Sequence, residues 1–166
     1  MPDRLPDVID PISFADKRVH LVGEIGLDGL DRLADRLVDR AGKVRLDLQF
    51  GKSGRQVTIT GRVAAELVLQ CQCCMEPLNW RVESDLNLGV VSSIEEALLL
   101  PDSMEALMVE TGGEVLTADI VQDELLLALP TIPQHPDCRP VNLNRQDSTR
   151  PNPFAELAQL KKNTSS

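Results

Sequence analysis

Three of the four cysteines lie within four consecutive positions, in the stretch LQCQCCMEPL at residues 69–78. Cys71 and Cys74 form a C-x-x-C pair, and the remaining cysteine, Cys138, completes an H-x-x-C pair with His135. A two-residue gap lets both side chains of a tight turn face one ion, and two such pairs supply a tetrahedral Cys₃His zinc site. The spacing therefore predicts a structural zinc ion held by Cys71, Cys74, His135 and Cys138.

Two other interpretations of the cysteines stay open. Redox chemistry favours a C-x-x-C pair at the start of a helix, where the helix dipole lowers a thiol pKa, but here Pro77 and a predicted strand follow. Thiols packed as small hydrophobic side chains would need no metal. Cys73 is expected to be a spare thiol, although it could replace one of the ligands. Four protein ligands leave no position for a water, so even a zinc site would be structural rather than catalytic.

Arginines provide the main candidate contacts to nucleic acid. Arg32, Arg36 and Arg40 recur every four residues on a predicted helix, a spacing that could present a phosphate-binding stripe. Aspartates interleave with them, however, and Arg32–Asp35 and Arg36–Asp39 are i,i+3 neighbours. A solvated helix face that pairs its own charges is therefore the favoured alternative.

Charge is concentrated in one segment of the chain. The net charge is −9, and residues 82–138 carry twelve Asp and Glu with no Lys or Arg. Residues 1–81 are balanced, with twelve charges of each sign, and residues 139–166 carry five basic against two acidic residues. An acidic segment of this kind repels phosphate and attracts cationic surfaces such as those of ribosomal proteins. The alternative interpretation is that the acidity only keeps the protein soluble.

The amino-acid composition and the missing motifs exclude several classes of protein. Aromatic residues make up only 2% of the chain, which excludes RNA modules that stack bases on aromatic side chains. The sequence contains no G-x-S-x-G, P-loop or G-x-G-x-x-G motif, so we expect no enzyme activity. No apolar run reaches the roughly 18 residues of a membrane span, and free cysteines without a signal peptide favour a reducing compartment. The chain is expected to be cytoplasmic.

Apolar periodicity predicts the secondary structure. Strands are predicted where apolar residues alternate, at residues 19–25, 44–50, 57–69, 80–90 and 107–109. The cysteines would then lie in the turn of a hairpin, and Gly61 would allow a bend or bulge. Helices are predicted at residues 28–40 and 117–129, the second capped by Thr117, with a short helical piece at 94–100.

These elements predict an α+β fold: a mostly antiparallel, curved sheet of about five or six strands with two main helices and a short C-terminal helix. The sequence leaves open whether the sheet closes into a barrel. Residues 1–138 are expected to form a single α+β domain, and residues 139–166 a polar linker and a short helix. In that helix Asn152 is the expected N-cap, Pro153 occupies the first position and Phe154 lies on the apolar face.

Several stretches together resemble the YceD family, whose members are known as large-subunit ribosomal RNA accumulation factors. LVLQCQCCMEPL is similar to the family's strand followed by C-x-R-C-x-x-P, with Cys73 where relatives usually have arginine. VQDELLLALPTIPQHPDC resembles its helix, L-P-x-x-P-x-H segment and downstream cysteine, and NPFAELAQLKK resembles its closing helix. DPISFADKRVHLVG is similar to its opening. These stretches follow the family's order from about residue 10 to residue 162.

The resemblance implies a cytosolic, non-catalytic role in the synthesis, processing or stability of large-subunit ribosomal RNA. Two mechanisms stay open, with ribosomal RNA or basic ribosomal proteins as the expected partners. A maturation factor would contact RNA through the three arginines and the basic tail, whereas an acidic adaptor would hold a basic protein on residues 82–138. A thiol- or metal-dependent enzyme is a less favoured third possibility. The positions that match the family pattern are Cys71, Cys74, Pro77, His135, Cys138, Asn152, Pro153 and Phe154.

Overall fold

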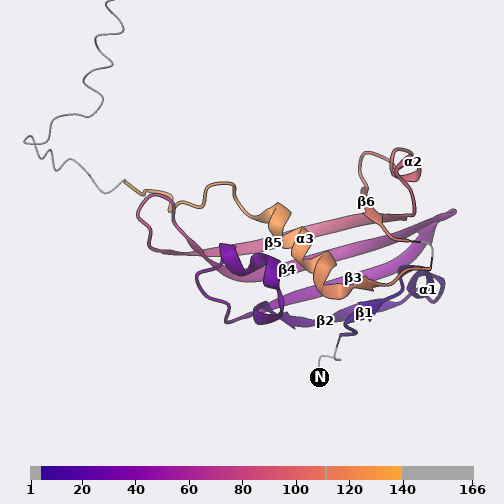
Figure 1. Cartoon of the computed structure of the whole chain (residues 1–166), viewed down its shortest axis with the longest axis horizontal. Helices are drawn as coiled ribbons and strands as arrows, with labels where there is room; N and C mark the ends of the chain where they lie inside the picture. Colours follow the sequence, from indigo (N-terminus) through magenta and orange to yellow (C-terminus); the bar gives the residue numbers. More distant parts are fainter. Residues whose placement is uncertain (1–4, 111, 140–166) are drawn as a thin grey trace, which may run out of the picture.

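A computed structural model describes residues 5–110 and 112–139, and its main layer is a five-stranded sheet (Figure 1). The strands follow the order β2–β3–β4–β5–β6. Neighbouring strands are antiparallel, except that β6 runs parallel to β5. Their bounds are β2 (His20–Gly26), β3 (Lys43–Ser53), β4 (Gln56–Gln70), β5 (Pro77–Val91) and β6 (Glu105–Met108). The predicted α+β class and mostly antiparallel sheet are therefore confirmed.

The sheet remains open. β2 and β6 lie at opposite edges and do not pair with each other, so the described strands form no closed barrel. Two further short strands, β1 (Val8–Ile9) and β7 (Val115–Leu116), pair with each other in a separate two-stranded sheet. Among residues 5–110 and 112–139, no helix has the length and apolar character needed to cross a membrane.

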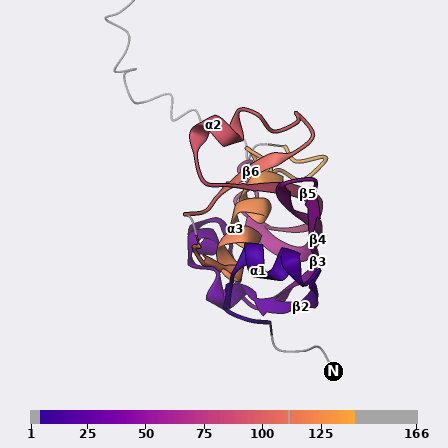
Figure 2. The same ribbon diagram turned by 90° about the vertical axis from the view of Figure 1, so that its right-hand side faces the viewer.

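One face of the sheet is buried beneath helices. Along β3, Val44, Leu46, Leu48 and Phe50 are fully or almost fully buried, whereas the residues between them are exposed. This alternation follows from the two-residue period of a strand with one face on the core. The helices α1 (Pro11–Asp16) and α3 (Thr117–Ala128) lie on the buried face (Figure 2).

The α3 helix matches its predicted position, but its start differs from the prediction. Ile120, Val121 and Leu125 are buried against the sheet, as a helical period requires. Thr117 does not cap the helix, since its hydroxyl donates a hydrogen bond to the Pro6 carbonyl at 2.6 Å. The N-terminal segment of the chain is thereby tied to the start of α3.

The α1 helix was not predicted. The Asp10 side chain accepts hydrogen bonds from the backbone N–H groups of Ile12 and Ser13, each at 3.0 Å, and Pro11 occupies the first turn. Aspartate before proline is a helix-start signal, because the side chain satisfies free N–H groups and proline has none to satisfy.

The predicted helix at residues 28–40 is wrong. The chain instead forms two short 3₁₀ helices, η1 (Leu27–Gly29) and η2 (Asp31–Arg36). Leu27, Leu30 and Leu33 are all fully buried, and a spacing of three residues places side chains on one face of a 3₁₀ helix. After η2 the chain becomes extended, and the Val38 N–H donates to the Val68 carbonyl of β4 at 2.7 Å.

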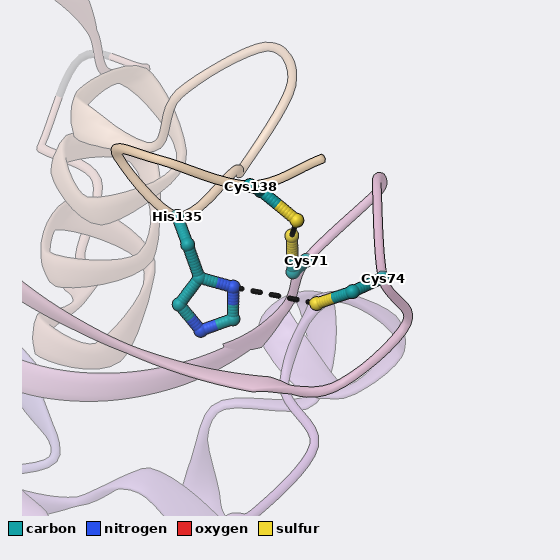
Figure 3. A group of neighbouring side chains, drawn as sticks. All are labelled: Cys71, Cys74, His135 and Cys138. Atoms are coloured by element: carbon teal, nitrogen blue, oxygen red, sulfur yellow. Dashed lines mark hydrogen bonds between the residues drawn. The ribbon is translucent and has the colours of Figure 1, made fainter. Parts of the chain in front are cut away.

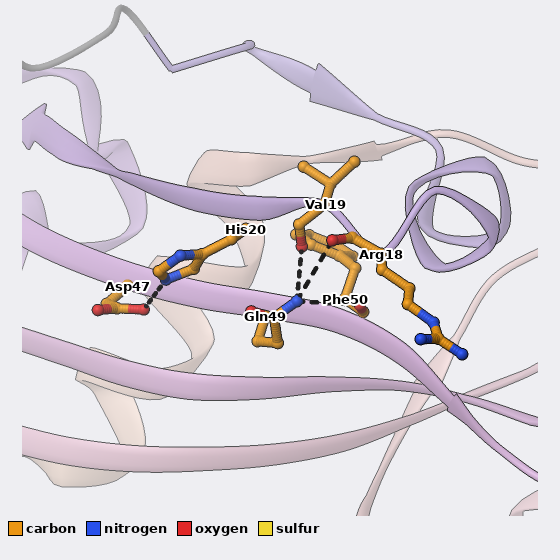
Figure 4. Close-up of polar contacts among 6 residues, drawn as sticks. All are labelled: Arg18, Val19, His20, Asp47, Gln49 and Phe50. Atoms are coloured by element: carbon orange, nitrogen blue, oxygen red, sulfur yellow. Dashed lines mark hydrogen bonds and ion pairs between the residues drawn. The ribbon is translucent and has the colours of Figure 1, made fainter.

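Polar contacts hold the edge strand β2 against β3 (Figure 4). His20 Nε2 lies 2.7 Å from Asp47 Oδ1 on the exposed face. The Gln49 amide donates to the carbonyls of Arg18 and Val19 at 3.4 and 3.3 Å. Arg18 has a left-handed backbone, with φ of 51°, so the Gln49 contacts lie where the chain turns from α1 into β2.

Gly61 serves close strand packing rather than the bulge that the sequence suggested. The ladders on both sides run through it without interruption, pairing Gly61 with Leu48 of β3 and with Leu86 of β5. A Cβ atom at position 61 would lie 2.0 Å from the Asp47 carbonyl oxygen. Glycine is therefore needed because the neighbouring backbone occupies the space of a side chain.

We expect Gly61→Ala to lower the free energy of unfolding by about 3 kcal/mol, because the new methyl group forces β3 and β4 apart. Gly51→Ala is a matched control on β3, since its Cβ would lie at an ordinary 3.8 Å from Thr58 Oγ1. Urea unfolding of both variants measures the difference. Equal stability of the two variants would contradict the close approach at Gly61.

Candidate metal centre

The cysteine turn is an extension of the β4–β5 hairpin. The alternation of β4 continues into Cys71, which is fully buried. The Cys71 N–H donates to the Glu76 carbonyl at 3.0 Å, and the Met75 N–H donates to the Cys71 carbonyl at 2.9 Å. Met75 adopts a left-handed backbone, with φ of 64°, which turns the chain back into β5. The hairpin predicted around the cysteines is therefore present.

The segment after α3 returns to this turn. The Gln72 N–H donates to the Pro133 carbonyl at 2.8 Å, which joins the turn to the loop at residues 129–139. Within this loop the Cys138 N–H donates to the His135 carbonyl at 3.2 Å. These bonds bring the H-x-x-C pair next to the C-x-x-C pair, although about 60 residues separate them in sequence.

Four potential ligand atoms converge between the turn and the loop (Figure 3). The thiols of Cys71, Cys74 and Cys138 and one ring nitrogen of His135 all lie within 4.8 Å of one another. Cys71 Sγ is 3.7 Å from Cys138 Sγ, and Cys74 Sγ is 3.4 Å from His135 Nδ1. Tetrahedral zinc with Zn–S bonds of about 2.3 Å and a Zn–N bond of about 2.0 Å separates its ligands by about 3.5–3.8 Å. The donor set therefore fits a tetrahedral ion.

The orientation of His135 also suits a ligand. Its Nε2 lies 3.2 Å from the Pro77 carbonyl oxygen, while Nδ1 faces Cys74. A carbonyl only accepts hydrogen bonds, so this contact assigns the proton to Nε2 and leaves the lone pair of Nδ1 toward the thiols. Histidine ligands commonly use their second nitrogen in this way, which fixes the ring and its tautomer.

The thiols have unequal proton affinities. Burial opposes ionisation of Cys71, but hydrogen bonds to the backbone of Cys74, His135 and Cys73 offset it and lower the Cys71 pKa to about 5. Hydrogen bonding to Cys73 and burial raise the pKa of Cys138 above its ordinary value, with Cys74 and Cys71 adding to the shift. The low pKa of Cys71 favours its thiolate form, and a divalent cation in the cluster would favour ionisation of the other thiols too.

Cys73 lies outside the four-atom cluster. It is half-buried and near Cys138, but it is not one of the residues whose ligand atoms converge. Three thiols and one imidazole are a donor set typical of structural zinc, and the four together complete a tetrahedron. The cluster could therefore hold an ion that joins the turn to the loop.

The three arginines that the sequence placed on one helix face do not share one helix, since Arg32 and Arg36 lie in η2 and Arg40 follows it. Arg32 forms an ion pair with Asp123 of α3, and its backbone N–H donates to Gln122 Oε1 at 2.8 Å. Arg40 donates to the Asp28 carbonyl at 2.6 Å and to the Asp31 carboxylate at 3.2 Å. These bonds differ from the predicted i,i+3 pairs and fasten η2 to its surroundings.

Arg36 is exposed at the end of η2. Two of the three arginines are therefore bonded within the chain, whereas the described residues include no ion pair of Arg36. The remaining candidates, Asn152, Pro153 and Phe154, lie outside the described residues, as does the predicted linker apart from Arg139.

Sequence reasoning missed the contacts that align the two halves of the cluster. The carbonyls of Pro133 and Pro77 accept from Gln72 and His135. Three of these four groups are backbone groups, which every residue carries, so no pattern of residue types marks them.

Comparison with known proteins places the chain in a family. A family model described as "Large ribosomal RNA subunit accumulation protein YceD" matches residues 59–161, which include all four cluster residues. The "Large ribosomal RNA subunit accumulation protein YceD" of Haemophilus influenzae is 31% identical over 169 residues, covering 95% of this chain and 97% of the relative. No solved structure gives a significant match. The chain belongs to the YceD family of large ribosomal RNA subunit accumulation proteins.

Proposed function

We propose that the protein is a non-enzymatic, cytoplasmic factor that supports the synthesis, processing or stability of large-subunit ribosomal RNA by binding ribosomal components. Family membership across almost the whole chain carries this proposal. The core packs one face of the open sheet, and the other face of β3 is exposed and free for binding. No catalytic step is needed for such a role.

We further propose that Cys71, Cys74, His135 and Cys138 hold one structural zinc ion. The separations of the ligand atoms and the orientation of His135 support zinc, as do three sulfur donors and one nitrogen donor. With all four positions filled by the protein, the ion would stabilise the loop and offer no place for substrate. Its contribution would be to keep the segment after α3 attached to the hairpin.

An acidic adaptor that holds a basic protein without touching RNA is the second candidate. The twelve acidic residues of 82–138, without a single Lys or Arg, favour it. The involvement of Arg32 and Arg40 in bonds within the chain also leaves less positive charge for phosphate. A polyanionic surface would attract cationic ribosomal proteins before they meet RNA.

Purified full-length protein should contain about one equivalent of zinc, and Cys74→Ser and His135→Ala should each reduce it below about half. Each substitution removes a donor that the tetrahedron requires. Cys73→Ser is the matched control in the same turn and should retain the metal. Elemental analysis of untagged protein prepared without chelator makes the measurement, and less than half an equivalent in the wild-type protein would refute the site.

Cells that lack the protein should show a lower ratio of large-subunit to small-subunit ribosomal RNA, and the full chain should restore it. The proposed role predicts this effect because the factor would support the large-subunit RNA and not the small-subunit RNA. Quantitative electrophoresis of total RNA gives the ratio. An unchanged ratio in the deletion strain, under conditions that demand rapid ribosome synthesis, would reject the proposed role.

Binding at graded salt separates the two candidate mechanisms. An adaptor should bind basic ribosomal proteins, release them as salt rises, and bind large-subunit RNA weakly with a shallow salt dependence. Direct RNA contact through η2 should instead show a steep dependence, and Arg36→Ala should reduce its logarithmic slope by about one. Steep binding to RNA with no retention of basic proteins would exclude the adaptor.

A further inference from the structure

Three large apolar side chains are exposed together at one end of the sheet. Ile94, Leu98 and Leu99 are 66%, 80% and 84% exposed, and we call them the α2 tip after the short helix α2 (Ile94–Ala97). Ile94 and Leu98 are four residues apart and share one side of this turn. Single exposed leucines are ordinary, but a group of this kind marks an interaction surface.

The segment that carries the α2 tip is firmly attached to β5. Leu100 and Met104 lie against the backbone of Gly89, where a Cβ atom would come within 2.8 and 2.7 Å of their side chains. The Asn87 amide donates to the Ser103 carbonyl at 2.8 Å. The segment after β5 thus packs Leu100 and Met104 onto the sheet and leaves the α2 tip exposed. Packing within the fold explains the first group of side chains but not the second.

A groove of about 510 Å³ begins beside the α2 tip. Leu99 and Glu96 line it from the α2 side, and Val57 and Val90 line it from β4 and β5. Ile12 of α1 and Arg55 of the β3–β4 turn also contribute to its wall. The groove offers a partly apolar recess for a side chain, and Leu99 joins it to the α2 tip.

Acidic side chains surround this apolar surface. Glu95, Glu96, Asp102, Glu105 and Glu110 are all exposed around α2 and β6. Hydrogen bonds from the backbone and hydroxyl of Ser92 lower the pKa of Glu96, and hydrogen bonds to its own backbone and to Ser93 lower that of Glu95. Both carboxylates are therefore ionised at neutral pH. Arg55 is the single cation among the groove-lining residues that the structure describes.

We propose that the α2 tip and the adjoining groove dock a cationic amphipathic segment of a protein partner. Apolar side chains of the segment would cover Leu98 and Leu99 and enter the groove, while its lysines and arginines would face the surrounding glutamates. The proposal rests on the proposed function, which requires a ribosomal component as partner, and it identifies the surface and the chemistry of that partner.

Charge selects this occupant over the alternatives. A second copy of the chain would place one acidic rim against another, and nucleic acid would bring phosphate to the same carboxylates. Both are disfavoured by like-charge repulsion. A cationic segment gains attraction to the rim and burial of apolar area at once.

A helical 18-residue peptide with leucines on one face and lysines on the other tests the proposal against the full-length protein. Titration calorimetry should show binding that weakens with salt, and Leu98→Ser/Leu99→Ser should weaken it at least about tenfold. Leu127→Ser is the matched control, because Leu127 is 71% exposed on α3, and it should bind normally. Glu95→Gln/Glu110→Gln should weaken binding and flatten its salt dependence, whereas Glu66→Gln/Glu76→Gln, away from the groove, should change both much less.

Equal binding by the Leu98→Ser/Leu99→Ser variant and the Leu127→Ser control would overturn the proposal. A dimer that the double variant disperses in sedimentation, or binding of a large-subunit RNA fragment that the variant abolishes, would also overturn it. The deletion strain keeps the two proposals distinguishable. An unchanged ribosomal RNA ratio in this strain would reject the family role, and the peptide titration would still test the docking surface. If the ratio falls and Leu98→Ser/Leu99→Ser restores it fully, only the docking proposal is rejected.

Discussion

The antiparallel ladder between β4 and β5 is the interaction on which the rest of the structure depends. It runs without a break from the pair Val57–Val90 to the pair Gln70–Pro77. Each strand has fifteen residues and therefore extends about 50 Å. The buried face of these strands carries much of the core, one end carries the cysteine turn, and the other continues into α2 (Figure 1). Both candidate sites are thus positioned by one rigid ladder.

The two ends of this ladder are stabilised by different means. The main core consists of residues from the sheet, α1, α3 and the 3₁₀ helices, and Cys71 lies outside that cluster. The loop at residues 129–139 reaches the cysteine turn through a few hydrogen bonds, and its residues from 131 to 139 are all exposed or only half-buried. Such a contact offers little hydrophobic stabilisation, so a metal ion is a suitable means of holding the loop there.

The sequence predicted the features that follow from the spacing of residue types along the chain. It missed the features that depend on contacts with residues distant in the sequence. The strands and the hairpin follow from alternation on one buried face, and the Cys and His spacing identified all four members of the cluster. The helix at 28–40 failed because leucines three residues apart also suit a 3₁₀ helix, and because Val38 pairs with β4. The convergence of the turn and the loop depends largely on backbone groups, which residue types do not reveal.

The negative charge of the protein is not spread evenly over its surface, because ion pairs neutralise charged residues in some places and not in others. On the exposed face of the sheet, ion pairs join Lys43 to Glu24 and Arg62 to Asp85, so positive and negative charges largely cancel there. Residues 82–138 contain no Lys or Arg of their own, and arginines from earlier in the chain pair with only three of their twelve acids among the described residues, namely Glu83, Asp85 and Asp123. The acids around α2 are in none of these ion pairs, so negative charge is concentrated at the same place where apolar side chains are exposed. A partner must satisfy both features together, and a chain that is both cationic and apolar does so.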